Sequence, residues 1–252
     1  MLGAAPAPVG EAKDCAAQIR HALARGGSKD VAKSSKRFFR EQVTCYGWKT
    51  APLRRFAHQW RRRLLAEKNL GFVVEVADQL FRRGPNEDKN FAVFLLEQSP
   101  AKLSEAEFHL FESWLDRVEN WSDHDGLTMY LLGPMMLADR SRAGKVFEWA
   151  KSNTPWGRRA AAVSLIRGIR RGFFWQETQR IARILLRDHE LMVQKGVGWM
   201  LREAVKANGP QVVSFLFSIR NEAPRLVLRT ACETLSGKIK RKVLGSRGEA
   251  GT

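Results

Sequence analysis

Hydrophobic residues recur along this chain three or four positions apart, which is the spacing of amphipathic α-helices. Strict alternation of apolar and polar residues is nearly absent, and no Asn-Gly turn joins two such segments. Ser104 and Glu107 form the pattern of a capping box, and Pro52 stands where a first-turn proline belongs. Further apolar-periodic segments begin at Pro155, Pro210 and Pro224. The pattern predicts an all-α protein of about a dozen helices with short connections.

A weak internal repeat indicates that these helices stack in pairs. The seven-residue spacing between Trp114 and Trp121 recurs, 35 residues later, between Trp149 and Trp156. A third step of the same length reaches two apolar residues, Ile184 and Leu191. Such a period is typical of helical-repeat solenoids of the HEAT or TPR kind. We therefore expect an α-solenoid of HEAT-like repeats with a concave surface.

This repeat domain is expected to span residues 13–240 as a single unit. Residues 1–12 are rich in Ala, Pro and Gly and predict a disordered N-terminal tail. Residues 241–252 predict a basic, flexible C-terminal tail.

The net charge indicates which class of partner the protein binds. The chain has 43 Lys and Arg against 26 Asp and Glu, a formal charge of +17. Such an excess favours a polyanionic partner, because each phosphate neutralised releases condensed counterions. A concave, basic surface would suit a DNA duplex.

Other partners and compartments are less well supported. The longest uncharged apolar-leaning run, residues 126–138, is shorter than the roughly 20 residues of a membrane-spanning helix, so we expect no membrane association. The N-terminus lacks the pattern of a secretory signal, which predicts a cytoplasmic protein, associated with the nucleoid through DNA. Three scattered cysteines predict neither disulfides nor a zinc site: Cys15, Cys45 and Cys232. We expect no cofactor, no obligate protein partner and a monomer.

The segment 191–207 separates into two faces at 100° per residue. The apolar face holds Val193, Val197, Met200, Leu201 and Ala204. Roughly opposite lie Lys195, Trp199, Arg202 and Lys206. A large indole among cations on a polar face needs a partner, and phosphate and sugar would suit it. Trp199 is therefore a candidate for binding nucleic acid.

A second helix, expected over residues 156–170, places Arg159, Arg167 and Arg170 together beside its apolar side. Their alignment makes a phosphate contact as plausible as a solvated charge. The segments 33–40 and 54–63 interleave cations with aromatic rings, which suits a nucleic-acid backbone, although a solvated helix face is the commoner explanation.

Residues 120–127, NWSDHDGL, hold the best candidate for catalysis. One interpretation makes Ser122 a helix N-cap and places Asp125 in the first turn, where the helix dipole favours a carboxylate. The other makes Asp125 a catalytic carboxylate that stabilises a developing cation one helical turn from Trp121. Consecutive residues on a helix diverge, so Asp123, His124 and Asp125 do not predict a metal site.

Three segments resemble a known family: NWSDHDGL, then TPWGRRAA, then QKGVGWMLREAVK, in this order along the chain. They look like the core motifs of the AlkD-like DNA alkylation-repair glycosylases, over roughly residues 35–240. That resemblance implies an all-α fold of HEAT-like repeats and removal of N3- and N7-alkylated purines from duplex DNA. His124 and Gly126 stand where the family commonly has Cys and Ser.

The resemblance also implies roles for individual residues. Trp121 and Asp125 would be the cleft Trp and the catalytic Asp, Arg159 the cleft Arg, and Trp199 the second cleft Trp. Phe38 falls where the family often has a Tyr facing the DNA. The remaining residues expected to bind DNA are Arg167, Arg170, Lys195, Arg202 and Lys206.

An alkylated purine carries positive charge, so its glycosidic bond breaks toward an oxocarbenium-like sugar and a neutral base. Asp125 would stabilise that sugar and position the attacking water. Two other classes remain open. A non-catalytic HEAT-like module that binds duplex or branched DNA would keep the cations without needing Asp125. A helical scaffold for RNA or an acidic protein would need neither the tryptophans nor the carboxylate.

Overall fold

The computed structural model describes residues 11–245, and within this range all regular secondary structure is helical, as the sequence predicts. Residues 1–10 of the expected N-terminal tail and 246–252 of the expected C-terminal tail lie outside the described residues. The chain divides into two compact units, residues 1–131 and 132–252. The expectation of one repeat domain over residues 13–240 stays a prediction.

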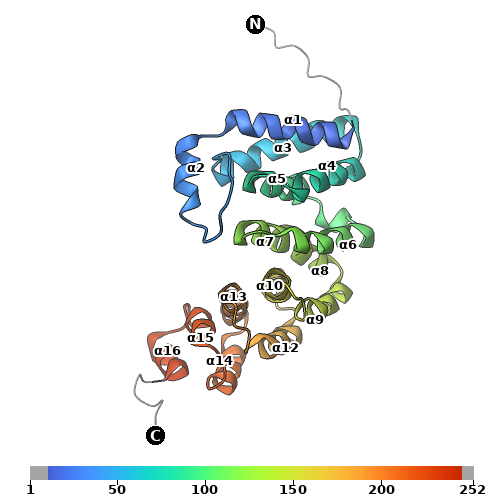
Figure 1. Ribbon diagram of the computed structural model, residues 1–252. Helices are drawn as coiled ribbons and strands as arrows, with labels where there is room; N and C mark the ends of the chain where they lie inside the picture. Colours follow the sequence, from blue (N-terminus) through green and yellow to red (C-terminus); the bar gives the residue numbers. More distant parts are fainter. Residues whose placement is uncertain (1–10, 246–252) are drawn as a thin grey trace. The chain divides into compact units, whose positions relative to one another are not determined.

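Helices of the first unit pack around α5, whose residues are almost all buried (Figure 1). Helix α5 contacts α3, α4 and α7, and α1 covers α4. The helices of this unit are α1 (Ala12–Gly26), α2 (Lys29–Lys36), α3 (Thr50–Glu67), α4 (Leu70–Arg82), α5 (Asn86–Leu96), α6 (Glu105–Ser113) and α7 (Trp121–Leu127). Short 3₁₀ turns lie at Pro100–Lys102 and Trp114–Arg117, and a π-helical turn, Thr128–Leu132, follows α7.

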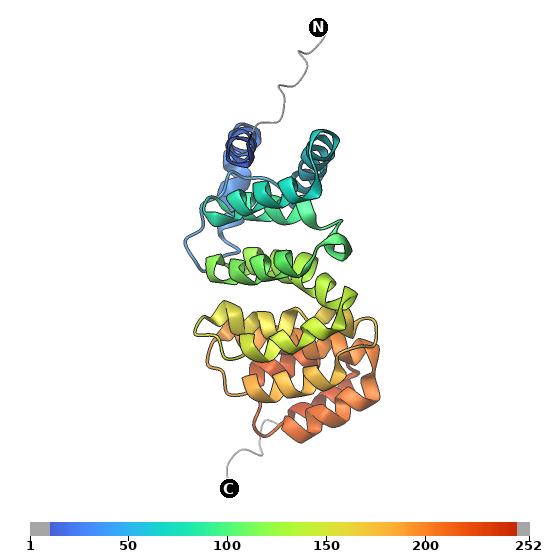
Figure 2. The same cartoon turned by 90° about the vertical axis from the view of Figure 1, so that its right-hand side faces the viewer.

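Helices of the second unit pack around α13, which contacts α10, α12 and α15. Figure 2 shows the helices of this unit in yellow to red, packed against one another. They are α8 (Gly133–Ala138), α9 (Val146–Trp149), α10 (Pro155–Val163), α11 (Ile166–Ile169), α12 (Trp175–Leu185), α13 (Leu191–Ala207), α14 (Gly209–Ile219), α15 (Arg225–Ala231) and α16 (Gly237–Leu244). A 3₁₀ segment, Arg140–Lys145, joins α8 to α9.

Several predicted helix starts are confirmed. Ser104 caps α6 and shares a complete capping box with Glu107. Pro155 is the first residue of α10, and Pro210 lies in the first turn of α14. The helix expected over residues 156–170 is wrong in its extent, because α10 ends at Val163 and the separate helix α11 begins at Ile166.

The 35-residue repeat holds for two copies. In each copy the first tryptophan, Trp114 or Trp149, is buried and precedes a non-helical connection. The second, Trp121 or Trp156, lies in the first turn of the helix that follows the connection. The prediction of a third copy is wrong, because Ile184 and Leu191 are exposed and do not contribute to the core as the tryptophans would. An apolar residue type at the right interval was too weak a criterion, since single exposed apolar residues are common.

Candidate functional site

Helix α7 begins two residues earlier than a Ser122 cap would require. Asn120 is the N-cap, and its Oδ1 accepts hydrogen bonds from the backbone N–H groups of Ser122 (2.8 Å) and Asp123 (3.1 Å). The prediction of Ser122 as the N-cap is therefore wrong. Asp125 is the fifth residue of α7, beyond the first turn, so capping does not account for its carboxylate.

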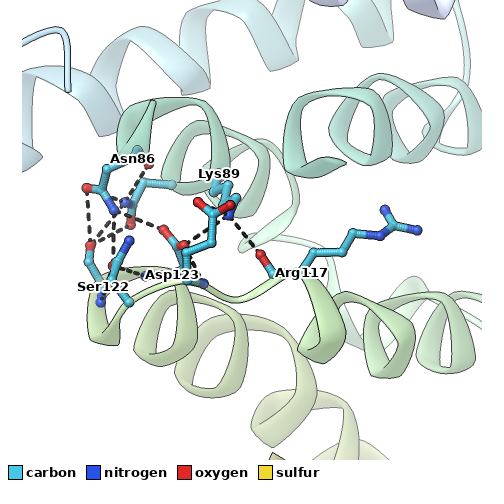
Figure 3. Close-up of polar contacts among 8 residues, drawn as sticks. Asn86, Lys89, Arg117, Ser122 and Asp123 are labelled. Atoms are coloured by element: carbon cyan, nitrogen blue, oxygen red, sulfur yellow. Dashed lines mark hydrogen bonds and ion pairs between the residues drawn. The ribbon is translucent and has the colours of Figure 1, made fainter. Parts of the chain in front are cut away.

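A buried polar cluster fixes the start of α7 on α5 (Figure 3). Both side chains of the Lys89–Asp123 ion pair are almost completely buried, with Nζ 3.2 Å from Oδ2. The Lys89 ammonium also donates to the carbonyl of Arg117 at 2.8 Å. Asp123 additionally accepts from Asn86 Nδ2 at 2.9 Å. These bonds join two helices that carry no other charged pair at this contact within residues 11–245.

Burial raises the pKa of the Asp123 carboxyl, and the Lys89 ammonium opposes that rise. A buried carboxylate needs such a partner, because its charge would otherwise be very costly away from water. The position of α7, and with it of Trp121 and Asp125, thus depends on the Lys89–Asp123 pair. Sequence reasoning missed Lys89 because it lies 34 residues from its partner in the chain.

Trp121, the first residue of α7, has a 37% exposed side chain. Its indole is held at two points: Nε1 donates to the carbonyl of Phe38 at 3.2 Å, and Phe39 stacks on the ring with centroids 5.3 Å apart. Phe38 itself is 66% exposed, as a residue that contacts DNA would have to be. The structure thus brings Phe38 and Trp121 together.

Asp125 follows Trp121 by one helical turn, and its side chain is 22% exposed. Its Oδ1 lies 2.8 Å from Nδ1 of His124, whose side chain is completely buried. Although consecutive residues diverge on a helix, this histidine turns back to its neighbour. An ionised carboxylate can only accept, so Nδ1 of His124 donates and orients Asp125.

Arg159 lies in the second unit, on α10, and is only 4% exposed. Its Nη1 donates to the carbonyl of Met192 at 2.7 Å. A Cβ at Gly196 of α13 would lie 3.0 Å from Arg159 Cγ, so this glycine leaves room for the arginine. The interpretation of Arg159 as a merely solvated charge is wrong.

The two faces predicted for the segment 191–207 are confirmed by α13. All five predicted apolar residues are buried, whereas Trp199 and Arg202 are half-buried and Lys195 and Lys206 are exposed. Gly198, next to Trp199, allows α15 to approach closely, because a Cβ there would lie 2.6 Å from Thr230 Cβ. The two glycines before Trp199 are thereby explained by packing.

A buried carboxylate that sequence reasoning missed organises the cations beside Trp199. Glu203 is 3% exposed and forms ion pairs with Arg170 and Lys206, each at 2.9 Å, and with Arg202 at 3.6 Å. Burial raises the pKa of Glu203, but hydrogen bonds from Lys206 and Arg170 outweigh it and hold the pKa below its ordinary value. Arg202 also pairs with Glu233.

The predicted site residues therefore form two groups. Phe38, Trp121 and Asp125 lie in the first unit. The second unit holds Arg159, Arg167, Arg170, Lys195, Trp199, Arg202 and Lys206. Within residues 11–245, no group of three His, Cys, Asp or Glu side chains could hold a metal ion. No helix in that range is long and apolar enough to cross a membrane.

Comparison with known proteins gives one family and two similar structures. The family model described as DNA alkylation repair enzyme matches residues 19–235. A solved structure described as a predicted DNA alkylation repair enzyme from Enterococcus faecalis is 15% identical, with a TM-score of 0.75, over 84% of this chain and 97% of its own. The structure of smu.31 from Streptococcus mutans UA159 is 18% identical, with a TM-score of 0.53, over 74% and 99%. No protein with a curated description matches.

Proposed function

This chain belongs to the DNA alkylation repair enzyme family, and we propose from that premise that it is a DNA glycosylase. Its substrate would be duplex DNA with positively charged N3- or N7-alkylated purines, and the bond hydrolysed would be the N-glycosidic bond. The observation that carries the proposal is the pairing of two partly exposed side chains on α7. The Trp121 indole and the Asp125 carboxylate lie one turn apart, and His124 orients the carboxylate.

Cleavage of this N-glycosidic bond requires mainly electrostatic stabilisation from the protein. Because an alkylated purine already carries positive charge, it leaves as a neutral base without a strong general acid. The sugar develops oxocarbenium character, which the Asp125 carboxylate would stabilise while it positions the attacking water.

The aromatic and cationic residues would hold the nucleotide. The family resemblance assigns Trp121 of the first unit to the deoxyribose or the cationic base, with a cation–π contribution of roughly 0.5–2 kcal/mol, and it assigns Trp199 of the second unit the same kind of contact. Arg159 would hold a phosphate, and its bond to Met192 would keep the guanidinium oriented. Lys195, on the exposed side of α13, would add a phosphate contact.

A second candidate function is a non-catalytic module that binds duplex or branched DNA. The net charge of +17 supports it equally, because that charge favours DNA binding whether or not a base is excised. Such a module would have no use for the partly exposed Asp125.

The test is release of free base from methylated duplex DNA under single-turnover conditions, with undamaged duplex as the control. The glycosylase should liberate N7-methylguanine or N3-methyladenine and leave an abasic site. Tight binding of the duplex without any released base would instead favour the non-catalytic module.

A further inference from the structure

A cavity of about 470 Å³ lies in the first unit, where α2 and the segment after it face α3, α5 and α7. Its volume falls within the roughly 300–1,000 Å³ of small-molecule sites. Five aromatic side chains line it: Phe38, Phe39, Trp48, Phe94 and Trp121. The proposed excision of a base uses only Trp121 and Phe38 of these five, so the cavity could hold a further part of the ligand.

The aromatic walls are held in place before anything binds. Trp48 donates from Nε1 to the carbonyl of Leu23 at 2.9 Å and stacks on Phe56, with ring centroids 5.4 Å apart and planes 2° apart. Trp121 and Phe39 form a second stacked pair. Because these rings are already ordered, an aromatic ligand would lose little free energy to ordering the site.

The cavity also has a neutral polar side, formed by Asn86, Asn90 and Ser122. Asn90 Nδ2 donates to Asn86 Oδ1 at 3.1 Å and to Ser122 Oγ at 3.0 Å. Asn90 Oδ1 accepts a long hydrogen bond, 3.4 Å, from the Ser122 hydroxyl. A ligand N–H could therefore donate to Asn90 Oδ1, while the Ser122 hydroxyl turns to a ligand acceptor.

One exposed cation lines the same cavity, and three more are next in sequence to residues that line it. Lys49 lines it, and Lys36, Arg37 and Arg40 are neighbours in sequence of the lining residues Ser35, Phe38 and Phe39. Within residues 11–245, none of these four cations has a carboxylate at ion-pair distance. The cavity therefore offers aromatic faces, amide and hydroxyl groups and the Lys49 ammonium, and its one carboxylate, Glu87, already accepts from three backbone N–H groups.

We propose that this cavity binds a single unstacked nucleotide of a DNA strand. The base stacks on the aromatic walls, its polar edge bonds to Asn90 and Ser122, and its phosphate lies at the cations. Aromatic stacking and cations at the backbone are the elements from which single-stranded nucleic acid is recognised. The inference rests on the proposed function for its assumption that DNA is the partner, and it extends that function to an unpaired nucleotide.

The test compares a duplex containing one unpaired adenine with the fully paired duplex, both undamaged, by fluorescence anisotropy at fixed salt. We expect the wild type to prefer the first by roughly tenfold, in line with stacking of one base. Ser35→Phe should abolish that preference because it fills the cavity from α2, a helix with no buried residue of its own. Thr50→Phe fills it from α3 and should act alike.

Ser34→Phe is the matched control, because Ser34 is exposed on α2 and does not line the cavity. It should keep the preference, and all three variants should bind the paired duplex as the wild type does. Equal binding of the two duplexes by the wild type, or an unchanged preference in Ser35→Phe and Thr50→Phe, would overturn the proposal. Because the DNA is undamaged, a protein that excises no base can still pass this test, and an active glycosylase can fail it.

Discussion

The orientation of the Asp125 carboxylate depends on its neighbour His124, a residue for which the sequence predicted no role. The completely buried imidazole contacts Oδ1 of the carboxylate at 2.8 Å and thereby orients the Asp125 side chain. A histidine where the family commonly has a cysteine is thereby a donor to the central residue.

This contact predicts the effect of two substitutions. His124→Leu removes the donor, and we expect the single-turnover excision rate to fall roughly 10- to 100-fold, as for the loss of a hydrogen bond to a charged group. His124→Asn places an amide near the position of Nδ1 and should retain more of the rate. The comparison requires that both variants show the wild-type thermal unfolding transition. Equal rates for the two variants would argue against an orienting role.

The environment of a single residue could be predicted from the sequence where it depends on neighbours in the same helix. The two faces of α13, and with them the partial exposure of Trp199, followed from a 100° rotation per residue. The Asn120 cap did not, because Asn and Ser are comparable caps and the sequence NWS offers both. Glu203 was missed because one of its ion-pair partners, Arg170, lies 33 residues away in the chain, at the end of α11.

At the scale of elements, the attachment of α7 to α5 decides where the candidate site lies. It depends on the buried Lys89–Asp123 pair and on hydrogen bonds from Asn86 (Figure 3). No local sequence pattern in either helix predicts this ion pair, because a lysine and an aspartate 34 residues apart are each typical of a solvated surface.

Removing one partner of this pair should destabilise the first unit strongly. Lys89→Met leaves the buried Asp123 without its counter-charge, and we expect a loss of roughly 3–5 kcal/mol in the free energy of unfolding. The double variant Lys89→Met/Asp123→Asn removes both charges and should recover a large part of that loss. Denaturant unfolding of the wild type, both single variants and the double variant measures the coupling. Purely additive losses would contradict the pairing.

The contact of α1 with α5 predicts a pH dependence. Arg20 Nε donates to Asp88 Oδ2 at 3.1 Å, and the Asp88 side chain is fully buried. Burial raises the pKa of Asp88 from 3.8 to about 6, against the opposing effect of Arg20. Below the unfolded value both states are protonated. As the pH rises from about 4 to about 6 the unfolded state loses this proton first, so stability falls.

The size of the effect follows from the shift, at about 1.4 kcal/mol per pKa unit, which gives roughly 2–3 kcal/mol in all. Asp88→Asn abolishes this contribution. The difference in unfolding free energy between wild type and Asp88→Asn should therefore change over pH 4–6. As the pH rises, the unfolding free energy of the wild type should fall relative to that of Asp88→Asn. A difference that stays constant, or changes in the opposite direction, would refute the assignment.

At the scale of the whole chain, the charge of +17 overstates what is available to a polyanion. Three cations predicted to bind DNA converge on Glu203: Arg170, Arg202 and Lys206. Lys195 is exposed and, among residues 11–245, has no carboxylate at ion-pair distance. Composition predicted the class of partner, but only the structure separates paired from unpaired cations.

This distinction is measurable as a salt dependence. The logarithm of the duplex affinity should fall linearly with the logarithm of salt concentration, by about 0.9 for each phosphate neutralised. Lys195→Ala should reduce that slope by about 0.9. Lys206→Ala is the matched control on the same helix and should change it less, because Lys206 already pairs with Glu203 at 2.9 Å. Equal changes in the two variants would mean that the ion pair does not restrain Lys206.

The most direct test of the central claim is the single-turnover rate of alkylpurine release by Asp125→Asn beside the wild type. Asp116→Asn, which changes an exposed aspartate in the same unit, serves as the control. The proposed role of Asp125 predicts that Asp125→Asn loses at least 100-fold in rate, while its duplex binding and the rate of Asp116→Asn stay unchanged. Release by Asp125→Asn at the wild-type rate would contradict a catalytic carboxylate on α7.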